Sequence, residues 1–260
     1  MFSKNDIDLR LKEKPQKGLI NVSTLLQHFS IVTYRVDFHK LRNLIPPQFE
    51  IDTIMIDGIK YGMLSAVTFI DKDFHFQKLL PFLKFEFPQT NYRAYVINKK
   101  TGEKCVWFFG TSLGSKFVFL PKYFWKMPWF YASYCIDIQN DNKYYNCKFD
   151  ITAPNANATL DLLIDENQDL ILEGFECQKE AILVLTHPVT GYFLKGKDEI
   201  GKYKIWHPLM NAKKGICKNA YFEIYEKLGL LTKEQMKNPL SVLITKEIKF
   251  EIELPPRKFE

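Results

Sequence analysis

The chain has 260 residues, 46% of them hydrophobic and 15% aromatic, which is enough for a core of ordinary size and excludes disorder as its main state. The 22 Phe and 13 Tyr favour strands, where flat rings pack on a pleated surface, over an all-helical bundle. Lys and Arg number 36 against 30 Asp and Glu, but the cations are scattered along the chain, so the composition predicts no nucleic-acid partner.

The sequence contains no segment typical of a leader or a membrane span. Residues 1–14 are rich in charged side chains, and the most apolar region, 117–138, is interrupted by Lys122, Lys126 and two prolines. The five cysteines are widely spaced and lack any CxxC pairing. We therefore expect a cytoplasmic protein with no disulfide framework, no bound metal, no cofactor and no membrane partner.

The first half of the chain predicts antiparallel strands joined by short turns. Residues 29–36 alternate and are rich in β-branched and aromatic side chains, which indicates a strand, and a helical turn follows from Asp37 to Leu44. Two hairpins are predicted next, over 54–70 around Asp57-Gly58 and over 91–110 around Thr101-Gly102. The strand pattern continues over 116–120, 130–138 and 144–151, with a turn at 140–142.

Helices are predicted only in the second half, over 175–185, over 220–228 with Gly229 as its C-cap, and over 233–237. A final strand is predicted over 240–254, closed by two prolines. Many strands and few helices give a β-dominated α+β pattern. We expect an N-terminal extension over 1–24 and a single domain over 25–260.

None of the common catalytic motifs occurs in the sequence. GxGxxG, GxxxxGK[ST], HExxH and GxSxG are all missing, which argues against nucleotide-binding folds and zinc proteases. The histidines show no pairing at metal-ligand spacing, so a metal site would need ligands from distant segments. The candidate functional residues are instead polar side chains within apolar strands.

Arg93 is the first such candidate. Asn91 and Arg93 share one face of their predicted strand with Tyr95 and Ile97, so the guanidinium points inward if that face lines a cavity. An inward Arg would bind a carboxylate through its planar, bidentate fork. The alternatives are an internal ion pair with Glu86 or Asp71, or a position on the solvent face.

Lys122 is the second candidate, within the aromatic segment LPKYFWKMPWFYASY at residues 120–134. A lysine buried among such rings has a lowered pKa, and its neutral amine can form a Schiff base with a carbonyl substrate. Alternatively, the ammonium groups of Lys122 and Lys126 reach solvent over the aromatic faces. Trp107 and His207 are interpreted mainly as packing residues.

The segment at 29–52, FSIVTYRVDFHKLRNLIPPQFEID, resembles the N-terminal signature of the acetoacetate decarboxylase-like superfamily. Later segments are most similar to its uncharacterised YqjF-like bacterial branch, and they follow in the expected order: FPQTNYRAYV at 87–96, VWFFGTSL at 106–113, MPWFYASY at 127–134, THPVTGYFLKG at 186–196 and IWHP at 205–208. The resemblance implies a closed antiparallel β-cone or barrel with flanking helices. It also implies a mostly apolar central cavity suited to a small organic acid.

The resemblance weakens at the catalytic residues of the decarboxylases. Their Schiff-base lysine follows a proline, and spacing places that pair on Pro128-Trp129, while Pro121-Lys122 lies seven residues early and lacks the second lysine. Gln89 and Gly62 stand near the positions of the family's two cavity glutamates, and Leu26 or Gln27 near that of its substrate-binding arginine. The resemblance therefore implies the fold without acetoacetate decarboxylation.

Three functional hypotheses follow. In the first, the protein binds a small organic acid or carbonyl compound, with Arg93 as anion anchor and with further ligand contacts from Gln89, Asn91, Trp107, Trp129, Tyr131 and His207. In the second, Lys122 is the Schiff-base amine of a lyase, aldolase or dehydratase acting on a keto acid. In the third, the protein is an interaction scaffold whose interior is filled by Phe and Trp. Whether the protein is an enzyme or a homo-oligomer is left open.

Overall fold

The computed structural model describes residues 14–140, 145–164, 173–196 and 199–259. Strands dominate it, and the six helices described are all short. The long strands are β1 (Val22–Asp37), β4 (Ile59–Phe76), β5 (Phe85–Asn98), β6 (Lys104–Leu113), β11 (Thr190–Lys195), β12 (Glu199–Trp206) and β14 (Ser241–Ile252), with β8 (Ser133–Asn140), β9 (Tyr145–Thr152), β10 (Ala158–Ile164) and β13 (Lys213–Phe222) beside them.

The remaining elements are short strands and helices at the edges of this framework. They are β2 (Phe49–Ile51), β3 (Thr53–Ile56), β7 (Trp129–Tyr131) and β15 (Arg257–Lys258), the 3-10 helix η1 (Lys116–Val118), and the α-helices α2 (Phe38–Arg42), α3 (Phe119–Phe124), α4 (Gln178–Thr186), α5 (Glu223–Lys227) and α6 (Lys233–Met236). No helix in the described ranges is long and apolar enough to cross a membrane.

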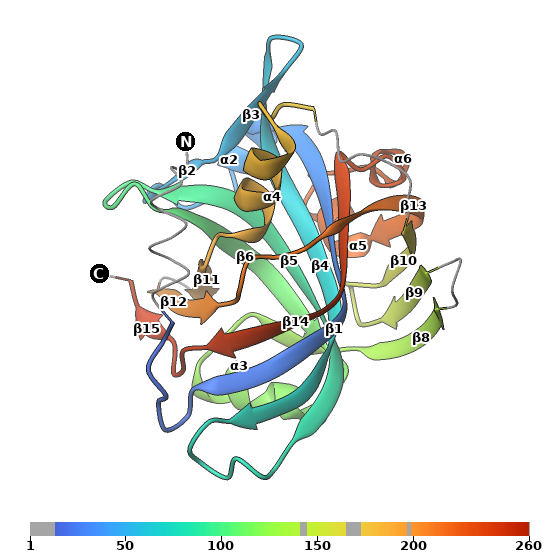
Figure 1. Cartoon of the computed structure of the whole chain (residues 1–260). Helices are drawn as coiled ribbons and strands as arrows, with labels where there is room; N and C mark the ends of the chain where they lie inside the picture. Colours follow the sequence, from blue (N-terminus) through green and yellow to red (C-terminus); the bar gives the residue numbers. More distant parts are fainter. Residues whose placement is uncertain (1–13, 141–144, 165–172, 197–198, 260) are drawn as a thin grey trace.

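Seven strands close into a ring in the order β14-β12-β11-β6-β5-β4-β1, and β1 pairs again with β14 (Figure 1). Closure depends on a short pairing of β12 with β14, in which Ile205 faces Ile252 and Trp206 faces Glu251. The neighbours in the ring are antiparallel except β6 and β11, which run parallel. The expected β-dominated fold with a closed ring of strands and flanking helices is thus confirmed.

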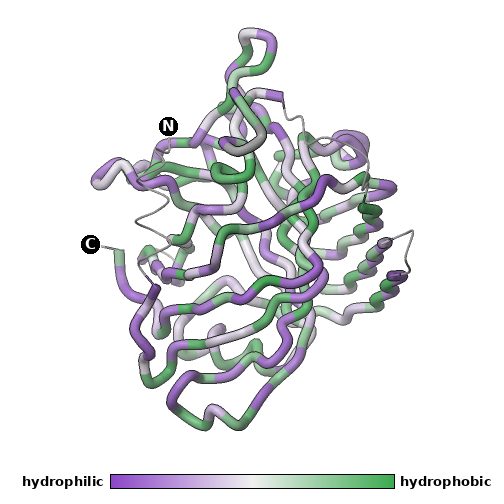
Figure 2. Tube along the Cα trace, viewed as in Figure 1, coloured by the Kyte–Doolittle hydropathy of each residue, from purple (hydrophilic) through white to green (hydrophobic). Residues whose placement is uncertain are grey.

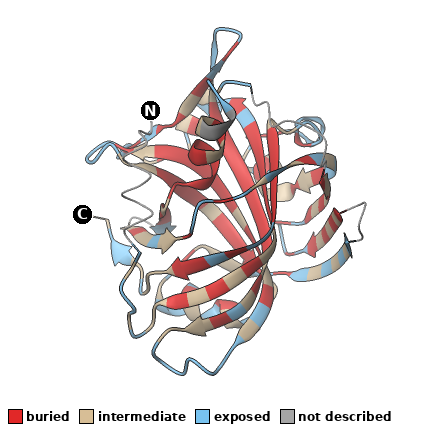
Figure 3. Cartoon of the chain, viewed as in Figure 1, coloured by how far each residue is buried: buried red, intermediate tan, exposed pale blue. Residues whose placement is uncertain are grey.

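The ring has a hydrophobic core on each of its two sides, which is why its strands are buried along most of their length (Figure 3). Side chains such as Phe29, Val67 and Phe108 point inward and form the inner core together with α4. Alternate side chains point outward and pack against a second sheet made of β13, β10, β9 and β8. This second sheet continues from β14 through its pairing with β13.

Three β-bulges change which residues of the ring strands point inward. Each bulge inserts one extra residue, at His28 in β1, at Asp73 in β4 and at Phe109 in β6, and the first two have positive φ. The bulged His28 lies toward the second sheet, where its Nδ1 is 2.6 Å from the hydroxyl of Tyr145. Inward positions therefore alternate regularly up to each bulge and shift by one residue after it.

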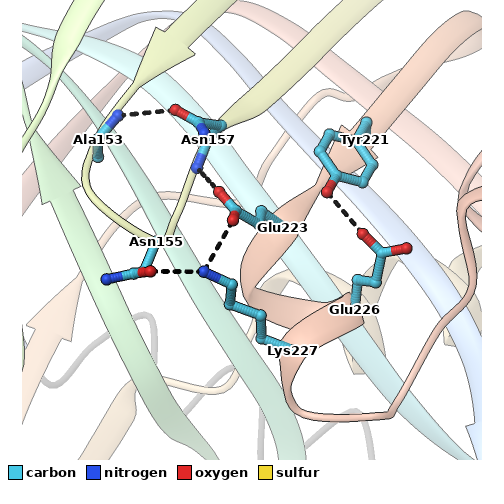
Figure 4. A network of polar contacts seen from close by, with 7 residues as sticks. All are labelled: Ala153, Asn155, Asn157, Tyr221, Glu223, Glu226 and Lys227. Carbon is cyan, nitrogen blue, oxygen red and sulfur yellow. Dashed lines mark hydrogen bonds and ion pairs between the residues drawn. The ribbon is translucent and has the colours of Figure 1, made fainter.

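The short helix α5 is held against the second sheet by a polar network (Figure 4). Glu223 accepts a hydrogen bond from the backbone amide of Asn157, and its carboxylate pairs with Lys227 at 2.8 Å. Lys227 also donates to Asn155, which lies in the same connection between β9 and β10. Because α5 has only five residues, these contacts rather than its own length fix its position.

Tyr225, on the same helix α5, contacts the wall of the ring. Its hydroxyl donates to the carbonyl of Ser65 in β4 at 2.7 Å and accepts from the amide of Arg93 in β5 at 3.2 Å. Ser65 and Arg93 face each other in the β4–β5 ladder. The buried phenol thus bridges two ring strands at the position that carries the candidate anchor.

Several predicted elements are confirmed, including the strand over 29–36 within β1, both hairpins, the helix at 233–237 and the last strand. The helix predicted over 175–185 begins at Gln178. The strand predicted over 130–138 is interrupted at Ala132. Most of the predicted turn at 140–142, Tyr144 of the following strand and residues 1–13 of the predicted extension lie outside the described residues, and β1 begins at Val22.

The strand predicted over 116–120 is wrong, and the helix predicted over 220–228 is shorter than expected. Residues 116–120 form η1 and the start of α3, because Ser115 accepts a hydrogen bond from the amide of Phe117 and begins a helical turn. The helix predicted over 220–228 starts only at Glu223. The three residues before it belong to β13, where Ala220 pairs with Leu160, so pairing between distant segments overrides the local helical pattern.

Replacing Tyr225 by Phe should lower the free energy of unfolding by about 1–3 kcal/mol, because the change leaves a buried amide and a buried carbonyl without their partner. Urea denaturation followed by circular dichroism measures the difference. The matched control is Tyr221→Phe, which removes a hydroxyl bonded to Glu226 at the surface and should cost much less. Equal losses in the two variants would contradict the bridging role of Tyr225.

Candidate functional site

The ring encloses a cavity with a largely apolar wall. Inward side chains such as Val67, Phe69 and Phe108 line it, together with Trp129 at the start of β7. The cavity offers about 90 Å³ to the centres of water-sized molecules. One buried water needs roughly 10–15 Å³ by this measure, so the space is suited to a small organic molecule.

A row of polar side chains crosses this apolar wall along β5. Gln89, Asn91 and Arg93 all line the cavity, because β5 contains no bulge and every second residue points inward. The side-chain oxygen of Asn91 accepts hydrogen bonds from Gln89 at 3.0 Å and from Thr111 at 2.9 Å. Thr111 reaches this face because the bulge at Phe109 shifts the alternation of β6. The side-chain oxygen of Asn91 thus has two donors, and the amide nitrogen is the hydrogen-bond donor of this side chain at the cavity wall.

Arg93 is buried, with 7% of its surface exposed, and its guanidinium contacts neutral groups. Nε donates to the hydroxyl of Ser65 at 2.9 Å, and Nη2 donates to the carbonyl of Leu185 at 3.3 Å. Leu185 lies in the last turn of α4, where the backbone carbonyls carry partial negative charge. Part of the role of Arg93 is thus to stabilise the end of this helix.

Neither carboxylate considered as a partner forms an ion pair with Arg93. Glu86 is exposed, and Asp71 accepts its hydrogen bond from Thr24. Within the part of the chain that the structure describes, no carboxylate forms a salt bridge to this guanidinium. The arginine therefore faces the cavity as a buried cation without an internal counter-ion.

Asp71 is a functional candidate that the sequence suggested only as a partner for Arg93. Its carboxyl lines the cavity, and burial raises its pKa to about 7, although the hydrogen bond from the Thr24 hydroxyl at 3.0 Å acts in the opposite direction. Asp71 faces Phe87 in the β4–β5 ladder, six residues along β5 from Arg93. At roughly 3.3 Å per residue the two groups stand about 20 Å apart along the strand, near opposite ends of the cavity.

His207 lies beside the cavity wall and does not line it. Its Nε2 is 3.0 Å from the carbonyl of Thr186, and its Nδ1 is 2.8 Å from that of Pro208. Burial lowers the pKa of His207, and the positive charge of Arg93 acts in the same direction. Since its ring also stacks on Phe250 at 4.7 Å, His207 is a packing residue that holds the end of α4 in place.

Trp107, Tyr131 and Lys122 do not line the cavity, contrary to the ligand contacts predicted for the two aromatic residues, and Lys122 has the alternative placement at solvent over an aromatic ring. Trp107 points outward because its neighbour Phe108 faces Arg93 across the ladder and points inward, and its ring packs on Phe49. Tyr131 ends β7 with 46% of its surface exposed. Lys122 is exposed on α3, with its ammonium 5.8 Å from the ring of Tyr123.

Three positions singled out by the family resemblance do line the cavity. Trp129 occupies the wall where spacing places the Schiff-base lysine of the decarboxylases, and Gln89 occupies it near the position of a glutamate. Leu26 lines the wall as well, whereas Gly62 faces outward against Leu41 and Ile51. No lysine is among the described residues that line the cavity.

Comparisons with known proteins place the chain in a family and in a fold group. Residues 24–248 match the family DUF2071, described as an uncharacterized conserved protein. No curated protein matches the sequence.

Solved structures with the same fold include the acetoacetate decarboxylase of Legionella pneumophila, with 13% identity, a TM-score of 0.57 and coverage of 98% of this chain and 95% of that one. An acetoacetate decarboxylase-like enzyme from Sphingomonas wittichii has 9% identity, a TM-score of 0.57 and coverage of 93% and 94%. The enduracididine biosynthesis enzyme MppR complexed with pyruvate has 14% identity, a TM-score of 0.56 and coverage of 95% and 93%.

Replacing Asp71 by Asn should stabilise the protein at high pH and have little effect near pH 4. The native carboxyl keeps its proton up to about pH 7, whereas the unfolded one releases it near 3.8, so folding takes up a proton between these values and stability falls as the pH rises through that window. An Asn side chain does not titrate, so it removes this loss of stability, and its oxygen can still accept the hydrogen bond from Thr24. Above pH 7, the free energy of unfolding of the variant should exceed that of the wild type by about 4 kcal/mol at most.

Urea denaturation of both proteins at several pH values between 4 and 8 measures this difference. As a control, Asp150→Asn changes a half-exposed carboxylate, paired with Lys148, on the second sheet. It should give no gain as the pH rises. A pH-independent effect of Asp71→Asn would show that the native carboxyl is already ionised near pH 4.

Proposed function

The chain belongs to the family DUF2071 and has the fold of acetoacetate decarboxylase-like proteins, and on this basis we propose that it binds a small organic acid or carbonyl compound in its central cavity. Arg93 is the anion anchor, and the amide of Asn91 is a second donor. Decarboxylase activity is lost. The observation that carries the proposal is the buried guanidinium that faces a largely apolar cavity and has no ion pair with any carboxylate among the residues that the structure describes.

The energetics of burial support an anionic ligand. A buried cation that is not paired is costly, and the neutral acceptors around Arg93 and the carbonyl end of α4 compensate only part of that cost. A carboxylate would supply the remaining charge and match the planar fork of the guanidinium. The ligand would thus be bound most strongly at its acidic end.

The rest of the cavity supports a ligand with an apolar portion. Between Arg93 and Asp71 the wall consists mainly of inward aromatic and aliphatic side chains, with Gln89 and Asn91 as its polar interruptions along β5. The raised pKa of Asp71 keeps this carboxyl largely neutral below about pH 7, so it would not repel an acid in that range. The structural relative MppR, whose structure contains pyruvate, supports a keto acid as one ligand class.

The positions of the lysines argue against Schiff-base chemistry. A carbonyl group in the cavity would need a neutral amine within bonding distance, and Lys122 is instead solvated on α3. Trp129 occupies the wall where the resemblance places the nucleophile of the decarboxylases, and an indole cannot form an imine. These placements favour a binding protein over a lyase that uses Lys122.

Arg93→Met should weaken the binding of 2-oxo acids at least about tenfold, because a charge-assisted pair contributes more than roughly 1.4 kcal/mol. Isothermal titration with pyruvate and with 2-oxo acids of longer alkyl chain measures the dissociation constants. Arg93→Lys should retain part of the affinity because it keeps the positive charge, and should lose the rest because an ammonium group lacks the planar pair of donors that a guanidinium offers. The control Arg35→Met changes an exposed arginine of β1 and should leave binding unchanged.

Circular dichroism should confirm that the Arg93 variants fold, because this side chain also holds the end of α4. If the wild-type protein bound none of these acids, or bound them equally well without Arg93, the proposed anchor would be wrong.

Borohydride reduction in the presence of pyruvate should leave the mass of the protein unchanged, because no described lysine lines the cavity. Intact-mass spectrometry detects a reduced adduct directly, and a lysine-dependent aldolase treated in parallel is the positive control. An adduct that maps to Lys122 and is abolished by Lys122→Met would restore the Schiff-base alternative.

A further inference from the structure

One end of the ring is closed by a cluster of aromatic rings that joins two segments distant in sequence. Phe117 of η1 packs against Phe74 of β4 at 5.6 Å and against Phe85 and Phe87 of β5 at 5.5 and 6.2 Å. The connection between β4 and β5 therefore lies beside η1 and α3, at the lower end of the molecule in Figure 1. We call residues 78–84 and 116–126 together the end face.

The end face carries an unusual number of exposed apolar side chains. Half of the large hydrophobic residues that are exposed in the described chain lie on it: Leu79, Leu80, Phe82, Leu83, Phe119, Tyr123 and Phe124. Phe82 and Phe124 are the most exposed of all, at 78% and 76% of their surface. Scattered apolar residues need no explanation, but a concentration of this kind marks an interaction surface.

The same surface is strongly basic. Lys78, Lys84, Lys116, Lys122 and Lys126 are all exposed, and the end face contains neither Asp nor Glu. Of these lysines, Lys84 forms an ion pair with Asp73 at 3.2 Å, and the other four form none with a carboxylate in the described part of the chain. In the β4–β5 connection a lysine stands at each end of a run of apolar residues, and the tube in Figure 2 is coloured by this hydropathy. With five lysines and no carboxylate, the residues of the end face carry a formal charge of +5.

The end face also adjoins the wall of the cavity. Phe117, Pro121 and Trp125 line the cavity from the same short segment whose other side chains are exposed, and Phe76 lines it just before the β4–β5 connection. A partner covering this surface would therefore stand next to one end of the cavity. The aromatic cluster separates the two.

We propose that the end face docks on an anionic lipid bilayer. Phe82 and Phe124 enter the headgroup region, where aromatic rings are favourable, and the lysines pair with lipid phosphates, each contributing about 1 kcal/mol near such a surface. This peripheral contact differs from the expectation of no membrane partner, which rested on the lack of a spanning segment. It does not depend on what occupies the cavity.

Charge distinguishes this partner from a second copy of the chain. Two end faces brought together would place five lysines opposite five lysines with no carboxylate on either surface, and like charges in an interface cost several kcal/mol. An anionic bilayer complements both the apolar and the basic residues.

Co-sedimentation of the full chain with vesicles tests the proposal. The protein should sediment with vesicles of phosphatidylglycerol and phosphatidylcholine, remain in solution with phosphatidylcholine alone, and bind less tightly as salt is added. The double variants Phe82→Ser/Phe124→Ser and Lys116→Glu/Lys122→Glu should each lower the affinity about tenfold or more. All four positions are partly or fully solvated, so the fold should be retained.

The control is Ile59→Ser, which removes another exposed apolar side chain, in the β3–β4 hairpin at the opposite end of the molecule in Figure 1, and should leave vesicle binding unchanged. The proposal is overturned if the wild type fails to sediment with anionic vesicles, or if Ile59→Ser weakens binding as much as the end-face variants do. It is also overturned if ultracentrifugation shows self-association that Phe82→Ser/Phe124→Ser abolishes, since the partner is then a second copy. Titration of these variants with pyruvate in vesicle-free buffer reports on the cavity separately.

Discussion

In a closed ring of strands, only alternate residues of each strand can reach the interior, and this constraint decides which side chains form the candidate site. The three bulges at His28, Asp73 and Phe109 adjust it locally. Without the bulge in β6, Thr111 would not share a face with Val106 and Phe108, and Asn91 would lose one of its two donors. β5 has no bulge, and it carries the uninterrupted polar row that ends at Arg93.

Arg93 is held in place by hydrogen bonds to both its backbone and its side chain. Its backbone amide is bonded to the hydroxyl of Tyr225, and its guanidinium is bonded to Ser65 on the neighbouring strand and to the end of α4. Tyr225 depends in turn on α5, which the network around Glu223 and Lys227 fixes to the second sheet. The position of the proposed anchor therefore depends on residues from four separate parts of the chain.

The sequence predicts the site well where local alternation is regular and poorly elsewhere. Period-two counting predicts that Asn91 and Arg93 share one face of β5, and the structure places that face on the cavity, a direction that the count alone leaves open. Trp107 was misplaced because its direction depends on the register between β5 and β6, which no local pattern encodes. Asp71 has the same inward spacing as Val67 and Phe69, but the bulge at Asp73 interrupts this pattern immediately afterwards. The large distance between Asp71 and Arg93 follows only from the register of β4 against β5.

The two cores on opposite sides of one wall have a consequence for how such proteins diversify. Outward residues such as Tyr92 and Ala94 maintain the contact with the second sheet, while inward residues such as Asn91 and Arg93 define the chemistry of the interior. Because the two sets alternate along the same strand, evolution can replace one while conserving the other. Solved structures share this fold at only 9–14% identity, which agrees with such a separation. For protein engineers, the alternation offers a scaffold in which the side chains of the interior can be changed at every second position without altering the outer contacts.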